Sequence, residues 1–287
     1  MINAGIIGVT GYAGEELIGI LLGHPEVRLT YLSAKIDKPT PINELFPKFG
    51  SRISLICAEP DLKLINKKCD LLFLALPHTV SMHLVPKLLA ANKRVIDLSA
   101  DYRFQDPRAY ESAYKIKHSD KAHLKSAVYG LPELWRAKIK SAQLIANPGC
   151  YPTAALLALA PAVSLNLIDL SSVIIDAKSG VTGAGRKAAE AFLFPEINED
   201  FKAYKVNTHQ HMPEINQELS KLAAKKVGVT FVPHLLPLNR GILLLRYVKP
   251  LSCAKRSTIL SWPNLATRLS QLSLDVNADN PVKRSMN

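Results

Sequence analysis

The chain has 287 residues, 48% of them hydrophobic, with 14 Gly and 19 Pro. This composition argues against a disordered chain or a fibrous repeat, because enough apolar surface is available for a core, and the length suits two domains sharing a cleft. The 36 Lys and Arg exceed the 24 Asp and Glu by 12. These basic residues are scattered in short clusters, so we expect an anionic small-molecule substrate and no nucleic-acid partner.

The N-terminal segment and the cysteines both favour a reducing cytoplasm. Residues 1–22 lack a basic region and contain Glu15 and Glu16, so neither a signal peptide nor a membrane span is predicted, and no membrane partner is expected. Neither a disulfide framework nor a structural metal is predicted, because CxxC pairs and zinc-ligand spacing are absent. The four cysteines are Cys57, Cys69, Cys150 and Cys253.

Strand-like and helical patterns alternate through the first half of the chain. The expected elements are strand 2–9, helix 15–22, strands 27–32 and 69–76, helix 81–91 and strand 94–99. Alternation at these lengths predicts an α/β fold with a doubly wound parallel sheet.

A second, α+β domain is expected after Asn147, where the pattern changes. Its elements are helix 153–163, strand 172–177, a glycine-rich loop at 179–186, helix 214–224 and strands 228–232 and 241–248. We therefore predict a dinucleotide-binding domain at 1–147, a catalytic and substrate domain at 148–248, and an atypical segment at 249–287, where the periodicity weakens.

The first predicted strand and helix are joined by Gly8-Val9-Thr10-Gly11-Tyr12-Ala13-Gly14, a GxxGxxG variant of the Rossmann dinucleotide fingerprint. Glycines let the backbone approach a pyrophosphate, whose charge then meets the amide groups of the helix N-terminus. This context favours a dinucleotide site over a turn without a ligand. The expected cofactor contacts are Gly8, Thr10, Gly11, Tyr12, Ala13 and Gly14.

The end of the second predicted strand favours NADP over NAD. An NAD site usually has an acidic residue there to bind the ribose 2′-hydroxyl, whereas this chain has Ser33 and Lys35. A hydroxyl and a cation suit a 2′-phosphate, although Lys35 equally fits an ordinary surface lysine.

Cys150 is the candidate nucleophile, because it stands in Asn147-Pro148-Gly149-Cys150-Tyr151-Pro152-Thr153 at the start of an apolar helix. A helix N-terminus stabilises a thiolate, so we expect a lowered thiol pKa. The other three cysteines have no such setting and fit inert thiols.

Two histidines, His209 and His211, precede the helix predicted at 214–224, and either could serve as a general base near pH 7. The HxH spacing also occurs in metal sites, but no further ligand stands at a suitable distance in the sequence. His78, after Pro77 at the end of a strand, fits either a lining residue of the cofactor cleft or a loop histidine.

The glycine-rich loop 179–187 carries hydroxyl groups and ends in two cations, so it could cradle an anion that Arg186 grips in a bidentate manner. It is not a Walker loop, since GxxxxGK[ST] is absent. Arg103 follows another strand end, where ligands bind in open α/β sheets; the alternative is a structural ion pair.

These motifs together resemble the N-acetyl-gamma-glutamyl-phosphate reductase family, NADPH-dependent enzymes of arginine biosynthesis related to aspartate-semialdehyde dehydrogenase. The resemblance covers residues 1 to about 248. The matching segments, in the family's order, are 8–17, 75–78, 97–104, 129–133, 147–153, 179–186, 209–215, 233–235 and 240–242.

The resemblance implies that Cys150 attacks the acyl phosphate to form a thioester, that NADPH reduces this thioester to the semialdehyde, and that His209 manages the proton. It also implies a homo-oligomer, a dimer or tetramer. The further cofactor residues are Pro77, His78, Ser179 and Gly180, and the substrate-binding residues are Arg103, Asn147, Gly183, Arg186, His211 and Glu214.

Three features depart from the family pattern. Gln210 stands where the family usually has Arg, and Thr79 where it has Gly. Segment 249–287 is short and unlike the family's C-terminal helix, so it fits a truncated or rearranged end. The alternatives are an N-acetyl-aminoadipyl-phosphate reductase of a lysine route, which a difference of one methylene makes hard to separate, and a non-catalytic NADP-binding relative.

Overall fold

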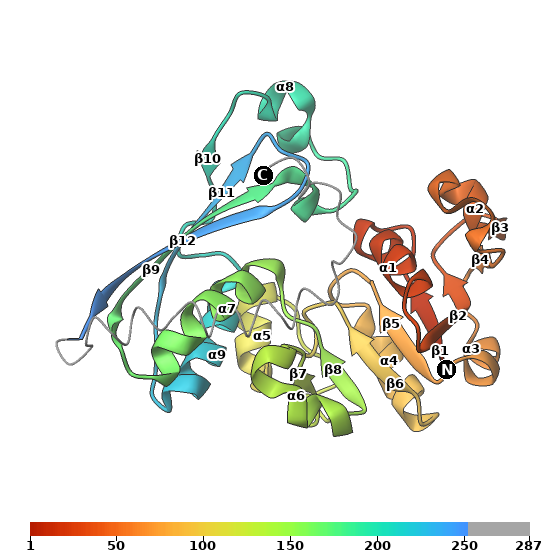
Figure 1. Ribbon diagram of the computed structural model, residues 1–287, viewed down its shortest axis with the longest axis horizontal. Coiled ribbons are helices and arrows are strands. Elements are labelled where there is room, and N and C mark those ends of the chain that lie inside the picture. Colours follow the sequence, from red (N-terminus) through yellow and green to blue (C-terminus); the bar gives the residue numbers. More distant parts are fainter. Residues whose placement is uncertain (252–287) are drawn as a thin grey trace.

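The computed structural model describes residues 1–251, which form two β-sheets with their covering helices (Figure 1). The predicted atypical segment 249–287 lies outside the described residues except for its first three, and Lys249 and Pro250 belong to the last strand. Within residues 1–251, no helix is long and apolar enough to cross a membrane.

The larger sheet contains β1 (Ile2–Ile7), β2 (Val27–Ser33), β3 (Thr40–Pro41), β4 (Ile56–Ala58), β5 (Leu71–Leu74), β6 (Arg94–Asp97), β7 (Val128–Tyr129) and β8 (Leu144–Ala146). The smaller sheet contains β9 (Ile168–Gly180), β10 (Lys202–Ala203), β11 (Thr230–Leu236) and β12 (Ile242–Pro250). The α-helices are α1 (Tyr12–Leu22), α2 (Ile42–Leu45), α3 (Leu62–Lys68), α4 (Ser81–Ala90), α5 (Pro107–Tyr114), α6 (Pro132–Ser141), α7 (Cys150–Ser164), α8 (Phe194–Ile197) and α9 (Met212–Ala223). Three 3-10 segments are η1 (Pro47–Arg52), η2 (Val181–Ala184) and η3 (Glu190–Phe192).

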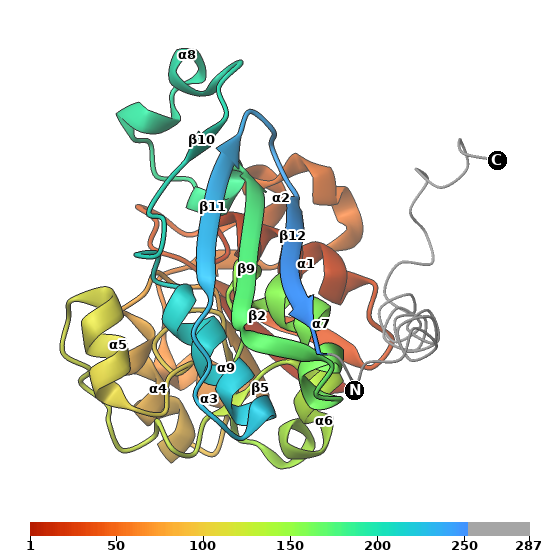
Figure 2. The ribbon, with the colours of Figure 1, turned by 90° about the vertical axis from the view of Figure 1, so that its left-hand side faces the viewer.

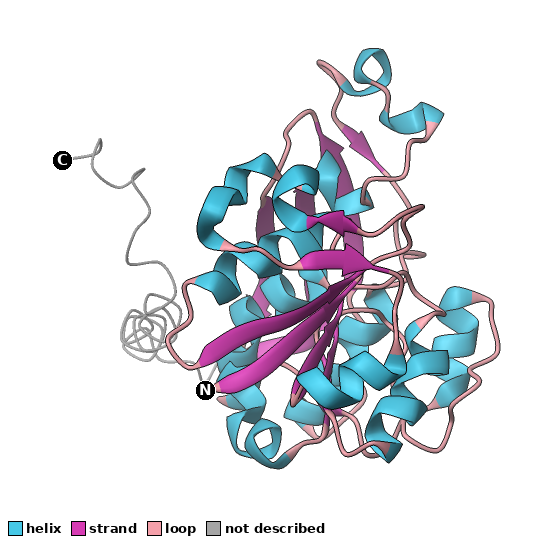
Figure 3. Ribbon diagram, turned by 90° about the vertical axis from the view of Figure 1, so that its right-hand side faces the viewer, coloured by secondary structure: helices cyan, strands magenta, loops and turns pink. Residues whose placement is uncertain are grey.

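The larger sheet has the order β3-β4-β2-β1-β5-β6-β8-β7 and is parallel except for β3. Helices cover both of its faces (Figure 3). A hydrophobic core lies on each face of this sheet, and consecutive residues of β1 point to opposite faces because side chains alternate along a strand. Ile6 belongs to the same core as Ile18 of α1, and Ile7 belongs to the same core as Val85 of α4. The predicted doubly wound fold is confirmed.

The register of the central strands brings their carboxyl ends to one edge of the sheet. Ile7 pairs with Leu74, Leu74 with Asp97, and Asp97 with Ala146. The segments that follow these four strands therefore meet, and they carry the glycine turn, His78, Arg103 and Cys150. Strand order also reverses at β1, so a ligand site is expected at this edge.

The smaller sheet, in the order β10-β11-β9-β12, packs one face on α7 and α9 (Figure 2). Alternate residues of β9, including Val173, Ile175 and Ala177, are buried in this second core. Helix α7 begins at Cys150, three residues before the predicted start of the helix at 153. The second predicted domain is therefore present as a mixed sheet with two main helices.

The turn between β1 and α1 requires glycine at two positions. Gly8 has φ of 97°, in the left-handed region, and a Cβ at Gly14 would lie 2.3 Å from the carbonyl oxygen of Gly8. A Cβ at Gly11 would meet that oxygen only at 3.6 Å, an ordinary contact. The close packing of α1 on β1 therefore depends on Gly14, not on Gly11.

Gly14→Ala should lower the free energy of unfolding by about 1–3 kcal/mol, because the backbone must shift to accept the methyl group. Gly11→Ala is the matched control and should cost less than about 1 kcal/mol. Urea unfolding followed by far-ultraviolet circular dichroism measures both, and equal losses in the two variants would contradict the packing argument.

Candidate active site

A pocket of about 600 Å³ lies where the carboxyl edge of the larger sheet meets the smaller sheet. It brings together many of the predicted site residues. Those that line it are Ala13, His78, Arg103, Asn147, Cys150, Ser179, Gly180, Gly183, His209 and His211.

The remaining predicted residues lie around the pocket, not on its wall. Ser33 is the last residue of β2, is fully buried, and its hydroxyl has no partner among the described residues. Lys35 lies two residues further on and is exposed. Glu214 is fully buried beneath the pocket. The others are Gly8, Thr10, Gly11, Tyr12, Gly14, Pro77 and Arg186.

Cys150 is the first residue of α7, and its side chain is exposed to the pocket. The predicted position at a helix start is confirmed, but the expected lowering of its pKa is wrong. Desolvation by the surrounding protein raises the pKa of the thiol, although the amides of Tyr151 and Cys150 and the charge of Arg103 act in the opposite direction. Cys150 is therefore mainly a thiol at neutral pH in the free protein.

His209 is buried and neutral, and its tautomer follows from one hydrogen bond. The backbone N–H of His211 donates to Nδ1 of His209 at 3.0 Å, so Nδ1 is an acceptor and the ring proton is on Nε2. Burial lowers the pKa of His209 to about 4, and the nearby charge of Lys205 contributes. At neutral pH His209 is therefore a hydrogen-bond donor through Nε2.

His78 and His211 are also held neutral. The N–H of Ala100 donates to Nδ1 of His78 at 3.0 Å, and burial together with the charge of Arg103 lowers the pKa of that histidine. Burial lowers the pKa of His211 well below its ordinary value, again with Arg103 contributing. A Cβ at Gly149 would lie 2.6 Å from Nε2 of His211 and 2.9 Å from a terminal nitrogen of Arg103, so a larger residue before the nucleophile would displace these side chains.

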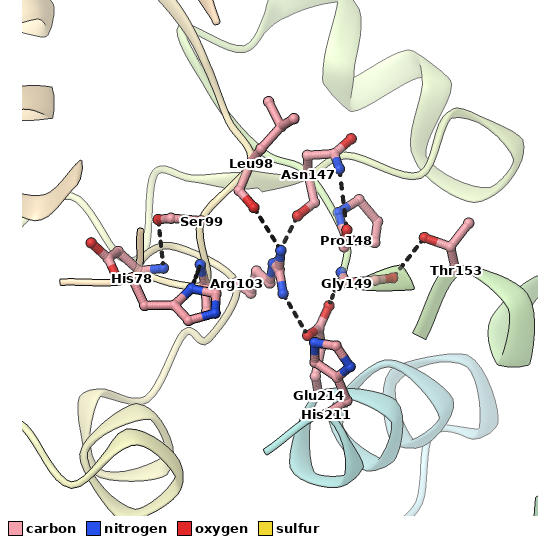
Figure 4. A network of polar contacts seen from close by, with 12 residues as sticks. His78, Leu98, Ser99, Arg103, Asn147, Pro148, Gly149, Thr153, His211 and Glu214 are labelled. Atoms are coloured by element: carbon pink, nitrogen blue, oxygen red, sulfur yellow. Dashed lines mark hydrogen bonds and ion pairs between the residues drawn. The ribbon is translucent and has the colours of Figure 1, made fainter. Parts of the chain in front are cut away.

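Arg103 and Glu214 form a buried ion pair that fixes the loop before Cys150 (Figure 4). Nε of the guanidinium donates to the carbonyl oxygen of Asn147 at 2.8 Å, and one terminal nitrogen donates to the carbonyl oxygen of Leu98 at 2.8 Å. The other terminal nitrogen lies 3.3 Å from a carboxylate oxygen of Glu214. The other carboxylate oxygen of Glu214 accepts from the N–H of Gly149 at 3.0 Å. Three of the five N–H groups of Arg103 therefore hold protein oxygens.

Arg186 lies against the glycine turn of the other domain. Its guanidinium stacks 4.2 Å from the ring centre of Tyr12 and pairs with Glu15 in the first turn of α1. Arg240, at the neighbouring β11–β12 turn, pairs with Glu16 at 3.0 Å. These contacts join the two domains beside the predicted cofactor turn.

Gln210, the residue between the two histidines, lines the pocket. Three further residues of the wall carry no signal in the sequence and come from the segment before His209: Lys202, Tyr204 and Lys205. The hydroxyls of Tyr204 and Tyr151 lie 3.1 Å apart. No short motif marks these residues, because strand pairing between β10 and β11 brings them to the site.

The turn at α1 is suited to a dinucleotide. Gly11 caps this helix without a side-chain hydrogen bond, so first-turn amides remain available to a pyrophosphate. The unpartnered hydroxyl of Ser33 lies at the end of the next strand. These residues fit the group that the motif predicts.

A second hollow of about 650 Å³ lies at the opposite, amino-terminal ends of the strands. It is lined by residues of α4, α6 and the start of β8, among them Leu89, Lys138 and Leu144. Within the described part of the chain, no group of three or more His, Cys, Asp or Glu is placed to hold a metal ion. Cys150, His209 and His211 all line the first pocket.

Comparison with known proteins gives two family matches that together span most of the chain. The semialdehyde dehydrogenase NAD binding domain matches residues 3–142, and the semialdehyde dehydrogenase dimerisation domain matches residues 150–262. An N-acetyl-gamma-glutamyl-phosphate reductase of Alkaliphilus metalliredigens is 47% identical over 259 residues, 90% of this chain and 75% of the relative. One of Desulfotalea psychrophila is 49% identical over 244 residues, 85% and 70% of the two chains.

Solved structures share the fold at low identity. An aspartate semialdehyde dehydrogenase of Francisella tularensis superposes with a TM-score of 0.64 at 13% identity, over 94% of this chain and 80% of that one. The enzyme of Candida albicans, solved with NADP, gives 0.59 at 14% identity, over 86% and 71%. The architecture of two domains is therefore shared with these proteins.

The raised thiol pKa predicts that alkylation of Cys150 by iodoacetamide in the free protein still accelerates above pH 9, since the thiolate fraction grows up to and beyond that pH. Mass spectrometry of the peptide that contains Cys150 measures the rate at each pH. A rate that levels off below pH 8 would show instead that the helix N-terminus outweighs burial.

Proposed function

The chain belongs to the N-acetyl-gamma-glutamyl-phosphate reductase family of semialdehyde dehydrogenases, and we propose that it reduces N-acetyl-gamma-glutamyl phosphate to N-acetylglutamate semialdehyde and phosphate. The observation that carries the proposal is Cys150 at the start of α7, in one pocket with His209 and the carboxyl edge of a parallel sheet. We assign the reaction to arginine biosynthesis in the cytoplasm.

The cofactor of the proposed reaction is NADPH, which supplies a hydride to the acyl carbon. The amides of the first turn of α1 bind the pyrophosphate, and Ser33 and Lys35 bind the 2′-phosphate. Two observations support this choice: β2 ends without an acidic residue, and the Ser33 hydroxyl has no partner among residues 1–251. His78 and Ser179 lie on the wall where the nicotinamide end would enter.

Cys150 is the proposed nucleophile. Its thiol loses a proton to solvent, and the sulfur then attacks the acyl carbon, so that a C–S bond forms while the C–O bond to phosphate breaks. The amides of Cys150 and Tyr151 and the charge of Arg103 favour the thiolate. Glu214 and Arg103 hold the preceding loop, so the sulfur keeps its position during the reaction.

His209 is the proposed hydrogen-bond donor to the oxygen of the reacting carbonyl group. Its Nε2–H stabilises the negative charge that develops on the carbonyl oxygen, both during thioester formation and after hydride transfer. The reduced thiohemiacetal then collapses, the C–S bond breaks, and Cys150 is regenerated. A histidine that stays neutral down to about pH 4 can keep this donor role over the physiological range.

The two proposed domains carry different parts of the reaction. Residues 1–147 carry the proposed cofactor site, and residues 148–248 carry Cys150, His209 and the smaller sheet. The loop at Asn147 to Gly149 lies at the boundary and contacts both parts through Arg103 and Glu214.

We also propose that two copies associate through the outer face of the smaller sheet. Four large apolar side chains on neighbouring positions of β9 and β12 are 41–60% exposed there: Ile174, Leu243, Leu245 and Tyr247. Asp176 and Lys178 lie opposite Leu245 and Leu243 on this face and are paired with each other. Exposed apolar side chains that gather on one sheet face, with their polar neighbours already paired, mark an interface. The family match over this region, described as a dimerisation domain, supports a second copy as its partner.

The function is tested in the reverse direction, by reduction of NADP followed at 340 nm with N-acetylglutamate semialdehyde and phosphate. We expect phosphate-dependent reduction, a smaller rate with NAD, and a loss of at least about 1,000-fold in Cys150→Ser, because the nucleophile is removed. Cys150→Ser should still bind NADPH. Activity that persists in this variant would remove Cys150 from the mechanism.

The interface is tested by Leu245→Lys, which places a charge in the centre of the apolar face. Sedimentation velocity should show a dimer or larger assembly for the unaltered chain and a smaller species for the variant. Leu238→Lys is the control, because Leu238 is 55% exposed but lies in the turn after β11. A monomeric unaltered chain would refute the proposal.

A further inference from the structure

The electrostatic character of the pocket wall is one-sided. Three cationic side chains line it, Arg103, Lys202 and Lys205, and no Asp or Glu does so among the residues that the structure describes. The histidines on the wall are neutral at pH 7, because their pKa values are lowered. The charge that a ligand meets therefore depends on which of the three cations is already balanced.

Two of the three cations have carboxylate partners. Arg103 lies 3.3 Å from the buried Glu214. Lys202 lies 2.8 Å from Asp200 and also donates to the carbonyl oxygen of Glu196 at 3.2 Å. Each of these charges is thus paired before a substrate arrives.

Lys205 differs from the other two. Within residues 1–251 its ammonium has no carboxylate in ion-pair distance, and its polar contact is the neutral side-chain oxygen of Gln210 at 3.5 Å. A contact at this distance is weak and easily exchanged for a better acceptor. Lys205 therefore contributes the unbalanced positive charge of the wall.

The backbone around Lys205 is fixed against β11. Tyr204 donates its N–H to the carbonyl oxygen of Pro233 at 3.0 Å, and Asn207 exchanges hydrogen bonds with Phe231 at 3.0 and 2.8 Å. Lys205 itself has φ of 45°, and its carbonyl oxygen accepts from the N–H of Thr208 at 3.0 Å. The lysine is thus presented from a constrained turn.

Lys205 lines the same pocket as His209, and its ammonium lies 3.5 Å from the side-chain oxygen of Gln210, the residue that follows His209. The ring of His209 lies 5.5 Å from that of Tyr151, the neighbour of the nucleophile. In an acyl phosphate the carbon that Cys150 attacks carries the phosphate through one bridging oxygen, whereas the α-carboxylate lies several bonds away. A cation on the His209 side of the pocket therefore faces the phosphoryl group.

We propose that Lys205 is the phosphate-binding cation of this site: its ammonium holds the phosphoryl oxygens of the acyl phosphate and, in the reverse reaction, inorganic phosphate. A lysine binds phosphate as a compact point charge and does not need the planar, two-point contact that an arginine makes. Gln210 holds the ammonium near the pocket until the phosphate replaces it. The assignment rests on the proposed function and names the group that recognises the leaving group.

The first test needs no turnover. The alkylation rate of Cys150 is measured with iodoacetate, an anion, and with iodoacetamide, its neutral counterpart, in the unaltered chain, Lys205→Met, Lys205→Arg and Lys202→Met. Lys205→Met should lower the iodoacetate-to-iodoacetamide rate ratio by about three- to tenfold, the size of one unit charge acting over several ångströms. Lys205→Arg should keep the ratio, and Lys202→Met should change it less, because the Lys202 charge is already paired.

Inorganic phosphate should slow iodoacetamide alkylation in the unaltered chain and in Lys205→Arg but not in Lys205→Met. In the NADP-reduction assay, Lys205→Met should raise the KM for phosphate at least tenfold with little change in the KM for the aldehyde. A raised aldehyde KM with an unchanged phosphate KM would assign the lysine to the α-carboxylate and overturn the proposal, as would equal effects of Lys202→Met and Lys205→Met. If the unaltered chain shows no turnover, the proposed function fails, and the alkylation ratios and phosphate protection still decide the role of Lys205.

Discussion

The buried carboxylate of Glu214 is the contact on which the geometry of the site depends. It extends from α9 in the second domain, accepts from the N–H of Gly149 and the hydroxyl of Tyr129, and pairs with Arg103. Breaking a buried pair by removing one partner typically costs about 3–5 kcal/mol, because the other charge is left uncompensated. One side chain therefore fixes the position of the nucleophile and couples the two domains at the point where the chemistry takes place.

A second buried carboxylate, that of Asp101, shapes the neighbouring loops. Asp101 accepts from the N–H groups of Thr79 and Met82 and from the hydroxyl of Tyr110. Thr79 has φ of 76°, a conformation that favours glycine, so its backbone is strained there. The hydrogen bond to Asp101, at 2.8 Å, helps hold this conformation and explains how the chain accommodates Thr79 where the family pattern has glycine.

The features that the sequence predicts well are those set by local backbone geometry. The glycine turn before α1 and the position of Cys150 at the start of α7 follow from short motifs. The features it does not predict depend on partners distant in the chain. Burial reverses the expected shift of the thiol pKa, and the pairing of β10 with β11 delivers Lys205 to a wall that no motif identifies. The position of Arg186 is likewise not predictable from the sequence, because its contact with Tyr12 requires both domains.

The HxH spacing, which also occurs in metal sites, here fixes the tautomer of His209. His209 and His211 are two residues apart, so the backbone N–H of His211 can donate to Nδ1 of His209. The ring proton of His209 is then on Nε2. A pair of histidines that binds a metal does not need this hydrogen bond. The intervening residue, Gln210, is then free to face Lys205. The segment from His209 to His211 therefore keeps the Nε2–H of His209 as a neutral hydrogen-bond donor and also contacts the Lys205 ammonium. A site built in this way can attract a dianion with one charge and still release it, because the remaining cations are already paired with Glu214 and Asp200.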